Sequence, residues 1–554
     1  MTDTFPPPKS LSLSSGSFSL FYALTTIAAS FLAMTWKSES QQTHIVLFTL
    51  EAWGHLRPIC SFIAKMVLAK RIYITLLTSS GYVDRIYKEI SRYLADGHNN
   101  MEFKGLIRVI GIERGDEAHF YSHALYDQFE KVYESLNNEE PIFCAHQKKY
   151  YTAISRPDVA VIDFLHCRPI EIARRISGDD VRIYMWYPAA VGMATVYAPK
   201  HLGGVGDPRP FIQQEAQETG REIKDVAQDF FFSPRHELLS VPGLPSLYDH
   251  ERLPQEVLNQ FHVGEAWRRI FDGLDIVDGV FLYTAEELEP VGVNVMKEWL
   301  DPLGKYSVYP IGPLLPPAEA RTHFTSETNL SNNANKIEAF MDIILKTRGP
   351  QSMLFISFGS LFFPMNQDKL RVVIDVVIEK GIPFIMCYGA HSAQIPEDVQ
   401  RKIDCCDVAL ASPWVPQQAI LAHPATSWFL SHCGQSGSFE SITAGVPMIC
   451  WPFHCDQPFN ASNLTENFDV AYELFEVRSG NGLSECHRLG RPPLNTLGAV
   501  REEFTRVLDD AFGSGGERKR KNMKRLQEII LSCWKDGGSS KSHFDRFLST
   551  LGSG

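Results

Sequence analysis

The chain has 554 residues and a formal net charge of −12. That length allows two or more domains, and the acidic balance argues against a nucleic-acid-binding surface. The 11 cysteines include no C-x-x-C pair, so we expect free thiols in a reducing compartment and no metal site.

Residues 1–42 are predicted to lie outside the folded domains. From Ser10 to Trp36 they carry no charge, so this stretch is a candidate membrane anchor or cleaved signal. Serine and threonine interrupt it, which weakens the case for a membrane span. We therefore expect a cytoplasmic protein, with membrane association through residues 10–36 as the open alternative.

Residues 43–317 alternate between short apolar runs and helical patterns. Strands are expected at 44–50, 72–78, 158–164 and 182–187. Such alternation predicts a doubly wound parallel sheet, in which ligands bind at the carboxyl ends of the strands. His55 and Asp163 both follow strand ends, so a histidine–carboxylate pair across the sheet is geometrically reasonable.

Residues 190–265 contain glycine, proline and aromatic residues with little pattern, and we predict that this insertion shapes a pocket or a lid. The polar residues 318–336 are the predicted linker. Residues 337–530 repeat the strand–helix alternation, and 531–554 contain a further helical pattern. The predicted fold class is therefore α/β, with two doubly wound, Rossmann-like domains.

The stretch from Trp414 to Gln457 is the most informative part of the chain. An apolar strand at 428–433 leads into a turn of small residues and then a helix, whose first backbone N–H groups favour a phosphate. The turn is neither G-x-G-x-x-G nor a P-loop. Aromatic and polar side chains suited to base, ribose, diphosphate and sugar surround it: Trp414, Glu440, His432, Asp456 and Gln457.

These 44 residues (457 − 414 + 1) resemble the donor-binding signature of family-1 UDP-sugar glycosyltransferases of plants and fungi. The matching motifs are W-x-P-Q at 414–417, H-C-G at 432–434, E-S at 440–441, G-V-P at 445–447, W-P at 451–452 and D-Q at 456–457. One departure is present, because Gln435, Ser436 and Gly437 replace the Trp-Asn-Ser usual in the family. How this chain holds the diphosphate is therefore an open question.

The resemblance implies the GT-B fold, in which two such domains face each other across a cleft and the last helix crosses back to the first domain. It implies His55 as the catalytic base and Asp163 as its partner. The implied donor-binding residues are Ser360, Trp414, Gln417, His432, Gly434, Ser436, Gly437, Glu440, Asp456 and Gln457. It implies no metal and no cofactor, since the UDP-sugar is a co-substrate.

The expected function is inverting transfer of glucose or xylose from a UDP-sugar to a hydroxyl of a lipophilic small molecule, such as a terpenoid or another secondary metabolite. We expect a monomer. Sequons at Asn460 and Asn463 argue against a lumenal location, because glycans there would crowd the sugar site.

Four alternatives remain: a sterol glucosyltransferase, a non-catalytic nucleotide-sugar binder, an epimerase and a serine hydrolase. The hydrolase reading rests on Gly434–Ser438, which looks like a nucleophile elbow around Ser436 but lacks its final glycine.

Overall fold

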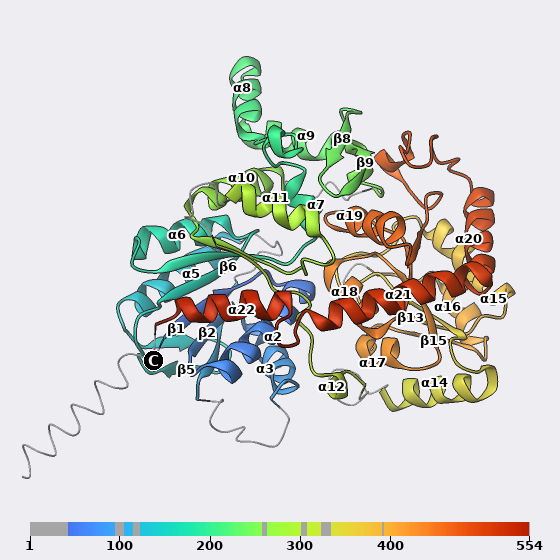
Figure 1. The fold of residues 1–554 in the computed structure, drawn as a ribbon, viewed down its shortest axis with the longest axis horizontal. Helices are drawn as coiled ribbons and strands as arrows, with labels where there is room; N and C mark the ends of the chain where they lie inside the picture. The colour runs from blue at the N-terminus through green and yellow to red at the C-terminus, as the bar shows by residue number, and fades with distance from the viewer. Residues whose placement is uncertain are drawn as a thin grey trace, which may run out of the picture.

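The computed structural model describes residues 43–94, 105–114, 122–256, 263–300, 307–322, 334–390 and 393–552. They form two sheet-centred domains side by side, with a smaller lobe above them (Figure 1). Within these ranges no helix is both long and apolar enough to cross a bilayer. The predicted apolar extension 1–42, including the stretch 10–36, lies outside the described residues.

The first domain is built on a seven-stranded parallel sheet in the order β11-β10-β7-β6-β1-β2-β3. Its strands are β1 His44–Phe48, β2 Tyr73–Ser79, β3 Ile107–Ile112, β6 Val159–Asp163, β7 Arg182–Tyr187, β10 Gly279–Leu282 and β11 Ser307–Pro310. Ile45 and Leu47 pack into one apolar cluster, and Val46 and Phe48 pack into another. This alternation places helices on both faces of the sheet.

The helices of this domain are α2 Trp53–Ala69, α3 Val83–Ser91, α5 His123–Asn137, α6 Cys167–Ser177, α10 Gly264–Ile276 and α11 Pro290–Leu300, with the short η1 Ser80–Tyr82. A small hairpin, β4 Ile142–Cys144 and β5 Lys149–Tyr151, lies outside the main sheet. Helix α2 contains Pro58, which has no N–H to donate, so the carbonyl of Gly54 is left without its helical partner.

The second domain contains a six-stranded parallel sheet in the order β14-β13-β12-β15-β16-β17. Its strands are β12 Met353–Ser357, β13 Phe384–Cys387, β14 Ala409–Ser412, β15 Thr426–Ser431, β16 Met448–Cys450 and β17 Ala471–Glu473. Its helical segments are α14 Ala334–Arg348, α15 Gln367–Glu379, α16 Glu397–Asp404, α17 Gln417–Ala422, α18 Gln435–Ala444, α19 Gln457–Ser462, η4 Asn463–Asn467, η5 Gly480–Leu483, α20 Leu497–Ala511 and α21 Ser514–Ser532. Both domains therefore have the doubly wound architecture expected from the alternating sequence.

The insertion 190–265 is more regular than its sequence suggests. It forms α7 Val191–Thr195, η2 Lys200–Leu202, α8 Arg209–Thr219, α9 Ile223–Phe232, the hairpin β8 Leu238–Val241 and β9 Leu244–Tyr248, and η3 Asp249–Arg252. Most of it rises as the lobe above the two sheets (Figure 1). Its aromatic residues pack with one another, as Phe231 does against Tyr197 at 5.7 Å between ring centroids. Packing within the lobe therefore stabilises helices that intrinsic propensity does not indicate.

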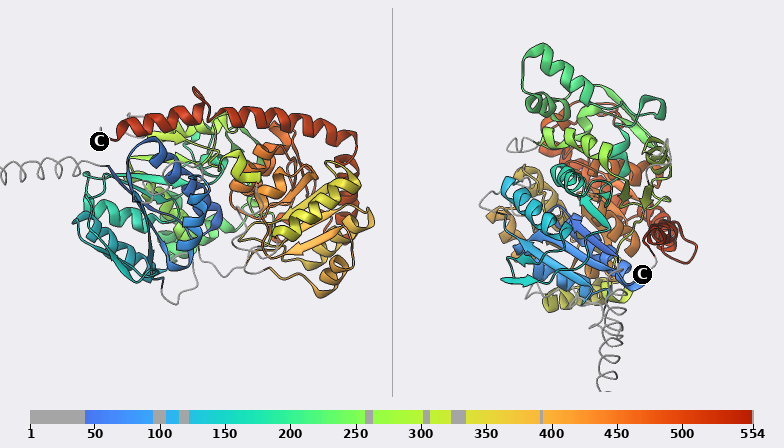
Figure 2. Two further views of the ribbon diagram at one scale, coloured as in Figure 1. Left: turned by 90° about the horizontal axis from the view of Figure 1, so that it is seen from below. Right: turned by 90° about the vertical axis from the view of Figure 1, so that its left-hand side faces the viewer.

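Two segments join the domains. The range 318–336 begins with a short helix, α12 Ala318–Thr322, and ends in the first turn of α14, while 323–333 lie outside the described residues. The last helix, α22 Ser539–Thr550, continues the line of α21 back across the first domain (Figure 2). There Phe547 is fully buried and lies 4.8 Å from Phe281 between ring centroids.

Candidate active site

The two residues predicted to form a proton-accepting pair are in direct contact. His55 lies in the first turn of α2 and Asp163 ends β6, the strand beside β1 in the sheet. Asp163 Oδ2 lies 2.8 Å from His55 Nδ1. The carboxylate is fully buried, whereas the imidazole keeps 18% of its surface exposed. The arrangement orients the ring and leaves Nε2 as the nitrogen that can reach a substrate.

Several donors hold the Asp163 carboxylate. Thr49 donates its hydroxyl to Oδ2 at 2.9 Å, the backbone N–H of Leu50 lies 3.4 Å from the same oxygen, and the N–H of Leu165 donates to Oδ1 at 3.1 Å. Burial alone would raise the pKa of Asp163, but the charge and hydrogen bond of His55 dominate and lower it. Asp163 is therefore an anion at neutral pH and can stabilise an imidazolium.

The start of α18, the helix predicted to hold the diphosphate, faces the start of α2. Ser436 donates its hydroxyl to the carbonyl of Gly54 at 2.9 Å. That carbonyl is available because Pro58 cannot bond to it. The interdomain contact therefore brings the helix terminus that was predicted to bind phosphate beside the residue that precedes His55.

His432 lies in a slot formed by two glycines. A Cβ added at Gly359 or at Gly434 would come within 2.7 Å of its imidazole, so both positions require glycine. Burial lowers the pKa of His432 to about 4, and its Nδ1 is a buried atom without a partner in the described structure. A neutral imidazole can donate one hydrogen bond to a phosphate. Ser360 follows Gly359 directly and is partly exposed.

The predicted ribose-binding carboxylate is already oriented by neighbours. Glu440 Oε2 accepts from the amide of Gln417 at 2.6 Å, and Oε1 accepts from Arg57 at 2.8 Å and from Gln418 at 3.0 Å. Arg57 belongs to α2 in the first domain, so this ion pair joins the two domains at the predicted nucleotide site. By contrast, a Cβ at Gly437 would meet only ordinary contacts, so steric constraint does not explain that glycine.

The indole predicted to stack on uracil is covered on one face. The guanidinium of Arg85, from α3, lies 4.2 Å from the Trp414 ring centroid and 3.5 Å from that of Trp53. Burial lowers the pKa of Arg85 to about 10. A base that stacks on this face of Trp414 must therefore displace the Arg85 side chain.

The two residues predicted to bind the sugar lie at the start of α19. Asp456 Oδ2 accepts the N–H of Gln435 at 2.9 Å, so it also caps the first turn of α18. Burial raises the pKa of Asp456 to about 6. The amide oxygen of Gln457 accepts the N–H of Phe453 at 2.8 Å, which leaves its NH₂ group as the donor for a sugar oxygen.

Sequence analysis missed three charged or aromatic neighbours of the site: Arg57, Arg85 and His166. His166 lies three positions after Asp163 in the chain, and its ring stacks on that of Phe48 at 4.6 Å between ring centroids. Burial lowers the pKa of His166 to about 4. Arg57 stands two residues after His55, a proximity that was visible in the sequence. Arg85 gave no signal, because only the docking of the domains brings it to Trp414.

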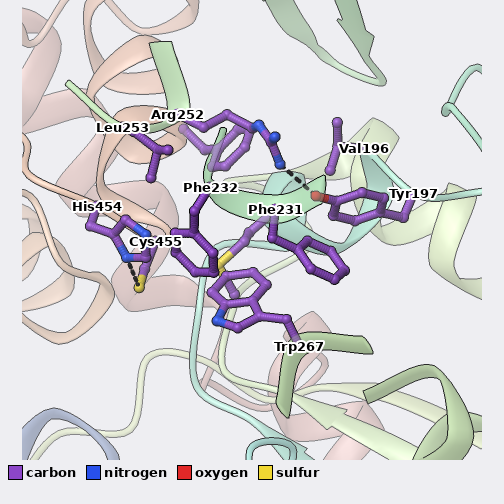
Figure 3. A pocket seen from close by; sticks show the side chains of 11 residues that line it. Val196, Tyr197, Phe231, Phe232, Arg252, Leu253, Trp267, His454 and Cys455 are labelled. Atoms are coloured by element: carbon purple, nitrogen blue, oxygen red, sulfur yellow. Dashed lines mark hydrogen bonds between the residues drawn. The ribbon is translucent and has the colours of Figure 1, made fainter. Parts of the chain in front are cut away.

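A pocket with an aromatic wall lies between the lobe and the second domain, next to Asp456 in the chain (Figure 3). The lobe contributes Phe231, Phe232 and Tyr197, and the second domain contributes His454 and Cys455. Phe232 stacks on His454 at 5.4 Å between ring centroids. The insertion thus lines a pocket with largely apolar walls, as predicted.

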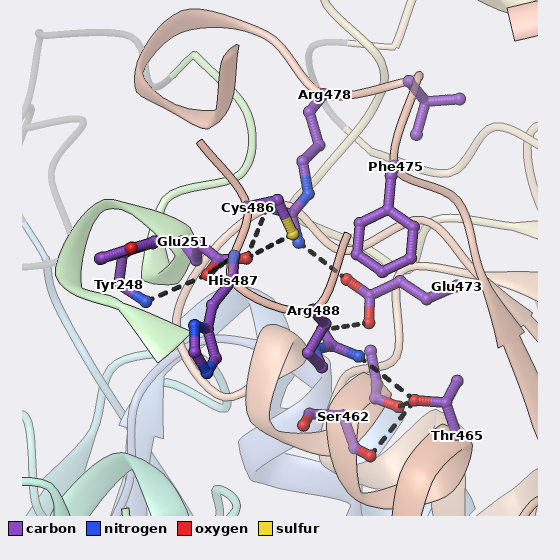
Figure 4. Close-up of polar contacts among 12 residues, drawn as sticks. Tyr248, Glu251, Ser462, Thr465, Glu473, Phe475, Arg478, Cys486, His487 and Arg488 are labelled. Carbon is purple, nitrogen blue, oxygen red and sulfur yellow. Dashed lines mark hydrogen bonds and ion pairs between the residues drawn. The ribbon is translucent and has the colours of Figure 1, made fainter. Parts of the chain in front are cut away.

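A buried polar seam fixes the lobe to the second domain (Figure 4). Glu251 of η3 accepts from Arg478 at 3.0 Å and from the thiol of Cys486 at 2.7 Å. Arg478 also pairs with Glu473 at 3.0 Å, and Arg488 completes the cluster through Glu473 at 2.6 Å. The pocket walls contributed by the two domains are therefore held in one arrangement.

Other chemistries find little support in the described part of the chain. It contains no cluster of three or more histidine, cysteine or carboxylate side chains that suits a metal ion. The hydroxyl of Ser436, the candidate hydrolase nucleophile, donates to a backbone carbonyl. All 11 cysteines are free thiols.

Comparison with known proteins gives a consistent result. A family model described as UDP-glucoronosyl and UDP-glucosyl transferase matches residues 309–481. UDP-glycosyltransferase eriJ of Hericium erinaceus is 29% identical over 91% of this chain and 97% of its own length. UDP-glycosyltransferase 74C1 of Arabidopsis thaliana is 24% identical over 93% of this chain and 100% of its own.

Solved structures share the fold. A UGT transferase from Siraitia grosvenorii in complex with UDP superposes with a TM-score of 0.64 at 19% identity, covering 92% of this chain and 100% of the other. Phytolacca americana UGT2, complexed with UDP-2fluoro-glucose and pterostilbene, superposes with a TM-score of 0.60 at 18% identity, covering 92% of this chain and 99% of the other.

The two doubly wound domains share the GT-B fold of these solved structures. The chain resembles the family-1 UDP-glycosyltransferases, because the family model matches residues 309–481 and relatives 29% and 24% identical align over more than nine-tenths of the chain.

Proposed function

We propose that this protein transfers a sugar from a UDP-sugar to a hydroxyl of a lipophilic small molecule. The observation that carries the proposal is the His55–Asp163 pair at 2.8 Å, placed beside the start of α18 by the contact between Gly54 and Ser436. A proton acceptor in one domain therefore faces a phosphate-binding terminus in the other.

In this mechanism His55 Nε2 accepts the proton of the acceptor hydroxyl while its oxygen attacks the anomeric carbon of the sugar. The bond from that carbon to the diphosphate oxygen breaks, and UDP leaves. Asp163 stabilises the imidazolium that forms. Direct displacement of an α-linked donor gives a β-glycoside, so the reaction is inverting.

The leaving diphosphate is stabilised by this chain's own groups. The first-turn N–H groups of α18 after Gln435 and the neutral His432 can each donate to it, whereas the hydroxyl of Ser436 already donates to the Gly54 carbonyl. The site thus supplies the charge stabilisation that a metal gives in other transferases, and we propose metal-independent transfer. Asp456 and the NH₂ of Gln457 bind the sugar, for which glucose and xylose are the proposed candidates.

The acceptor class follows from the walls of the pocket in Figure 3. Phenylalanine and tryptophan rings with few polar groups suit terpenoid, sterol or phenolic acceptors better than sugars. The two sequon asparagines are buried, and Asn463 donates to the Leu288 carbonyl at 3.0 Å. Glycosylation there would disrupt the fold, which, with the free thiols, supports a reducing compartment.

The test is to incubate the purified protein with UDP-glucose or UDP-xylose and acceptor panels, and to measure UDP release and product mass. We expect turnover with lipophilic alcohols or phenols, and none with His55→Ala, which should still bind UDP. Turnover only of oligosaccharides would refute the lipophilic acceptor. UDP binding without any turnover would favour a non-catalytic binder, and conversion of the UDP-sugar alone would favour an epimerase.

Trp414→Ala tests the nucleotide site separately. Loss of base stacking should weaken UDP binding by about 1–3 kcal/mol, measured by calorimetry. Trp53→Ala removes the other ring that sandwiches Arg85 and serves as the matched control. Unchanged UDP affinity in Trp414→Ala would mean that the indole only packs.

A further inference from the structure

A second hollow lies where the two domains and the segment joining them meet. It opens to solvent, and its volume is about 260 Å³. Helix α2 forms one wall, the residues from Pro313 to Arg321 form another, and the end of α21 with Trp534 forms a third. None of the residues assigned above to catalysis or donor binding lines it.

Most of the wall is apolar. Leu315 and three prolines line the hollow from the joining segment, and Trp534 lines it from the second domain. Leu68 and Leu531, which also line it, are 53% and 38% exposed. Exposed leucines beside a hollow of this size indicate a binding surface for an apolar chain.

The charged side chains of the wall are both cations, and several of its buried hydrogen-bond donors have no partner. The Lys65 ammonium lies 3.9 Å over the Trp534 ring and forms no ion pair with any residue the structure describes. Arg321 Nε, the Tyr93 hydroxyl and Trp534 Nε1 are buried and have no hydrogen-bond partner in the same described residues. No carboxylate lines the hollow.

The electrostatic surroundings reinforce this bias. Burial and the nearby Lys541 lower the pKa of Lys65 to about 8. Burial also lowers the pKa of Arg321, although Glu440 and Glu319 oppose that effect. Both cations therefore lack solvation that an incoming anion would replace.

We propose that this hollow binds a single-chain amphiphile with a carboxylate head, such as a medium-chain fatty acid. Its apolar chain lies along Leu68, Leu315 and Trp534, and its carboxylate accepts from the cations and unpartnered donors of the wall. A cationic head of the same chain length would meet Lys65 and Arg321 unfavourably. The inference does not depend on the transfer reaction, because the hollow and the donor site share no residue.

The test is calorimetric titration of the full-length protein with decanoate and, separately, with decyltrimethylammonium. We expect saturable, one-site binding of decanoate, and at least about tenfold weaker binding of the cation. The variant Lys65→Gln/Arg321→Gln should lose about tenfold or more in decanoate affinity. The control variant is Lys521→Gln, which replaces an exposed lysine on α21 and should leave decanoate affinity unchanged.

Two further variants keep the test decisive if the double variant is unstable. Leu315→Trp fills the hollow and should weaken decanoate binding. Lys65→Arg keeps the positive charge and should retain decanoate affinity. Unsaturable binding, equal affinity for both head groups, or decanoate affinity unchanged by filling or neutralising the hollow would each overturn the proposal. Because binding is measured directly, an absence of glycosyl transfer would not affect the result.

Discussion

Replacing Asp163 by asparagine should separate the charge of this residue from its geometry. Three donors converge on Oδ2, from His55, Thr49 and Leu50, so the asparagine carbonyl should take that place and keep the imidazole oriented. What is lost is the negative charge. At a separation of about 4 Å and an effective dielectric constant of about 20, its attraction for an imidazolium is about 4 kcal/mol.

A loss of about 4 kcal/mol in transition-state stabilisation corresponds to about 10³-fold in kcat. The assay is steady-state UDP release at saturating donor and acceptor, with UDP affinity measured separately by calorimetry. UDP affinity should not change, because Asp163 contacts nothing in the second domain that binds nucleotide. The matched control is Thr49→Val, which removes one hydrogen bond from the same oxygen. It should lower transition-state stabilisation by about 1 kcal/mol. A loss in kcat below about tenfold for Asp163→Asn, or an equal loss of UDP affinity, would show that the carboxylate is only structural.

Three further outcomes follow from the same contacts. Gly434→Ala should weaken UDP binding markedly, because the new Cβ would lie 2.7 Å from His432; the roomier Gly437→Ala is its control, and equal affinities would contradict the steric argument. Burial raises the pKa of Glu289 to about 7, so the folded state holds a proton that the unfolded chain releases between pH about 4.5 and 7. Stability should fall by up to about 3 kcal/mol as pH rises through that window. Glu289→Gln should reduce the difference in the free energy of unfolding between pH 5 and pH 8, measured by urea titration. An unchanged difference between the two pH values would contradict the raised pKa. Arg478→Met leaves Glu251 buried without its cation and should lower the free energy of unfolding by about 3–5 kcal/mol, whereas Arg501→Met, which breaks an ion pair with Glu379 that is exposed on both sides, should lower it by less than about 1 kcal/mol.

Much of the architecture was predictable because buried parallel strands appear as unbroken apolar runs. The β7 range was predicted to the residue, and β1 and β6 to within two residues. The contact between His55 and Asp163 could be expected because their strands end at the same edge of one sheet.

The interdomain contacts were not predictable in this way. Arg57 and Glu440 are separated by 383 positions, and no local pattern reports a pair at that distance. The helices of the lobe were also missed, and contacts between them, such as Phe231 against Trp267, are not visible in a local sequence pattern.

Helix α22 has a consequence for the order in which this molecule can be completed during synthesis. Phe62 of α2 and Phe281 of β10 both pack against Phe547, yet β11 ends at Pro310 and α22 begins only at Ser539. While the intervening chain is still on the ribosome, the first domain has its strands but lacks the ring that covers them. The helix bearing the proton acceptor is therefore sealed only after the second domain has been synthesised.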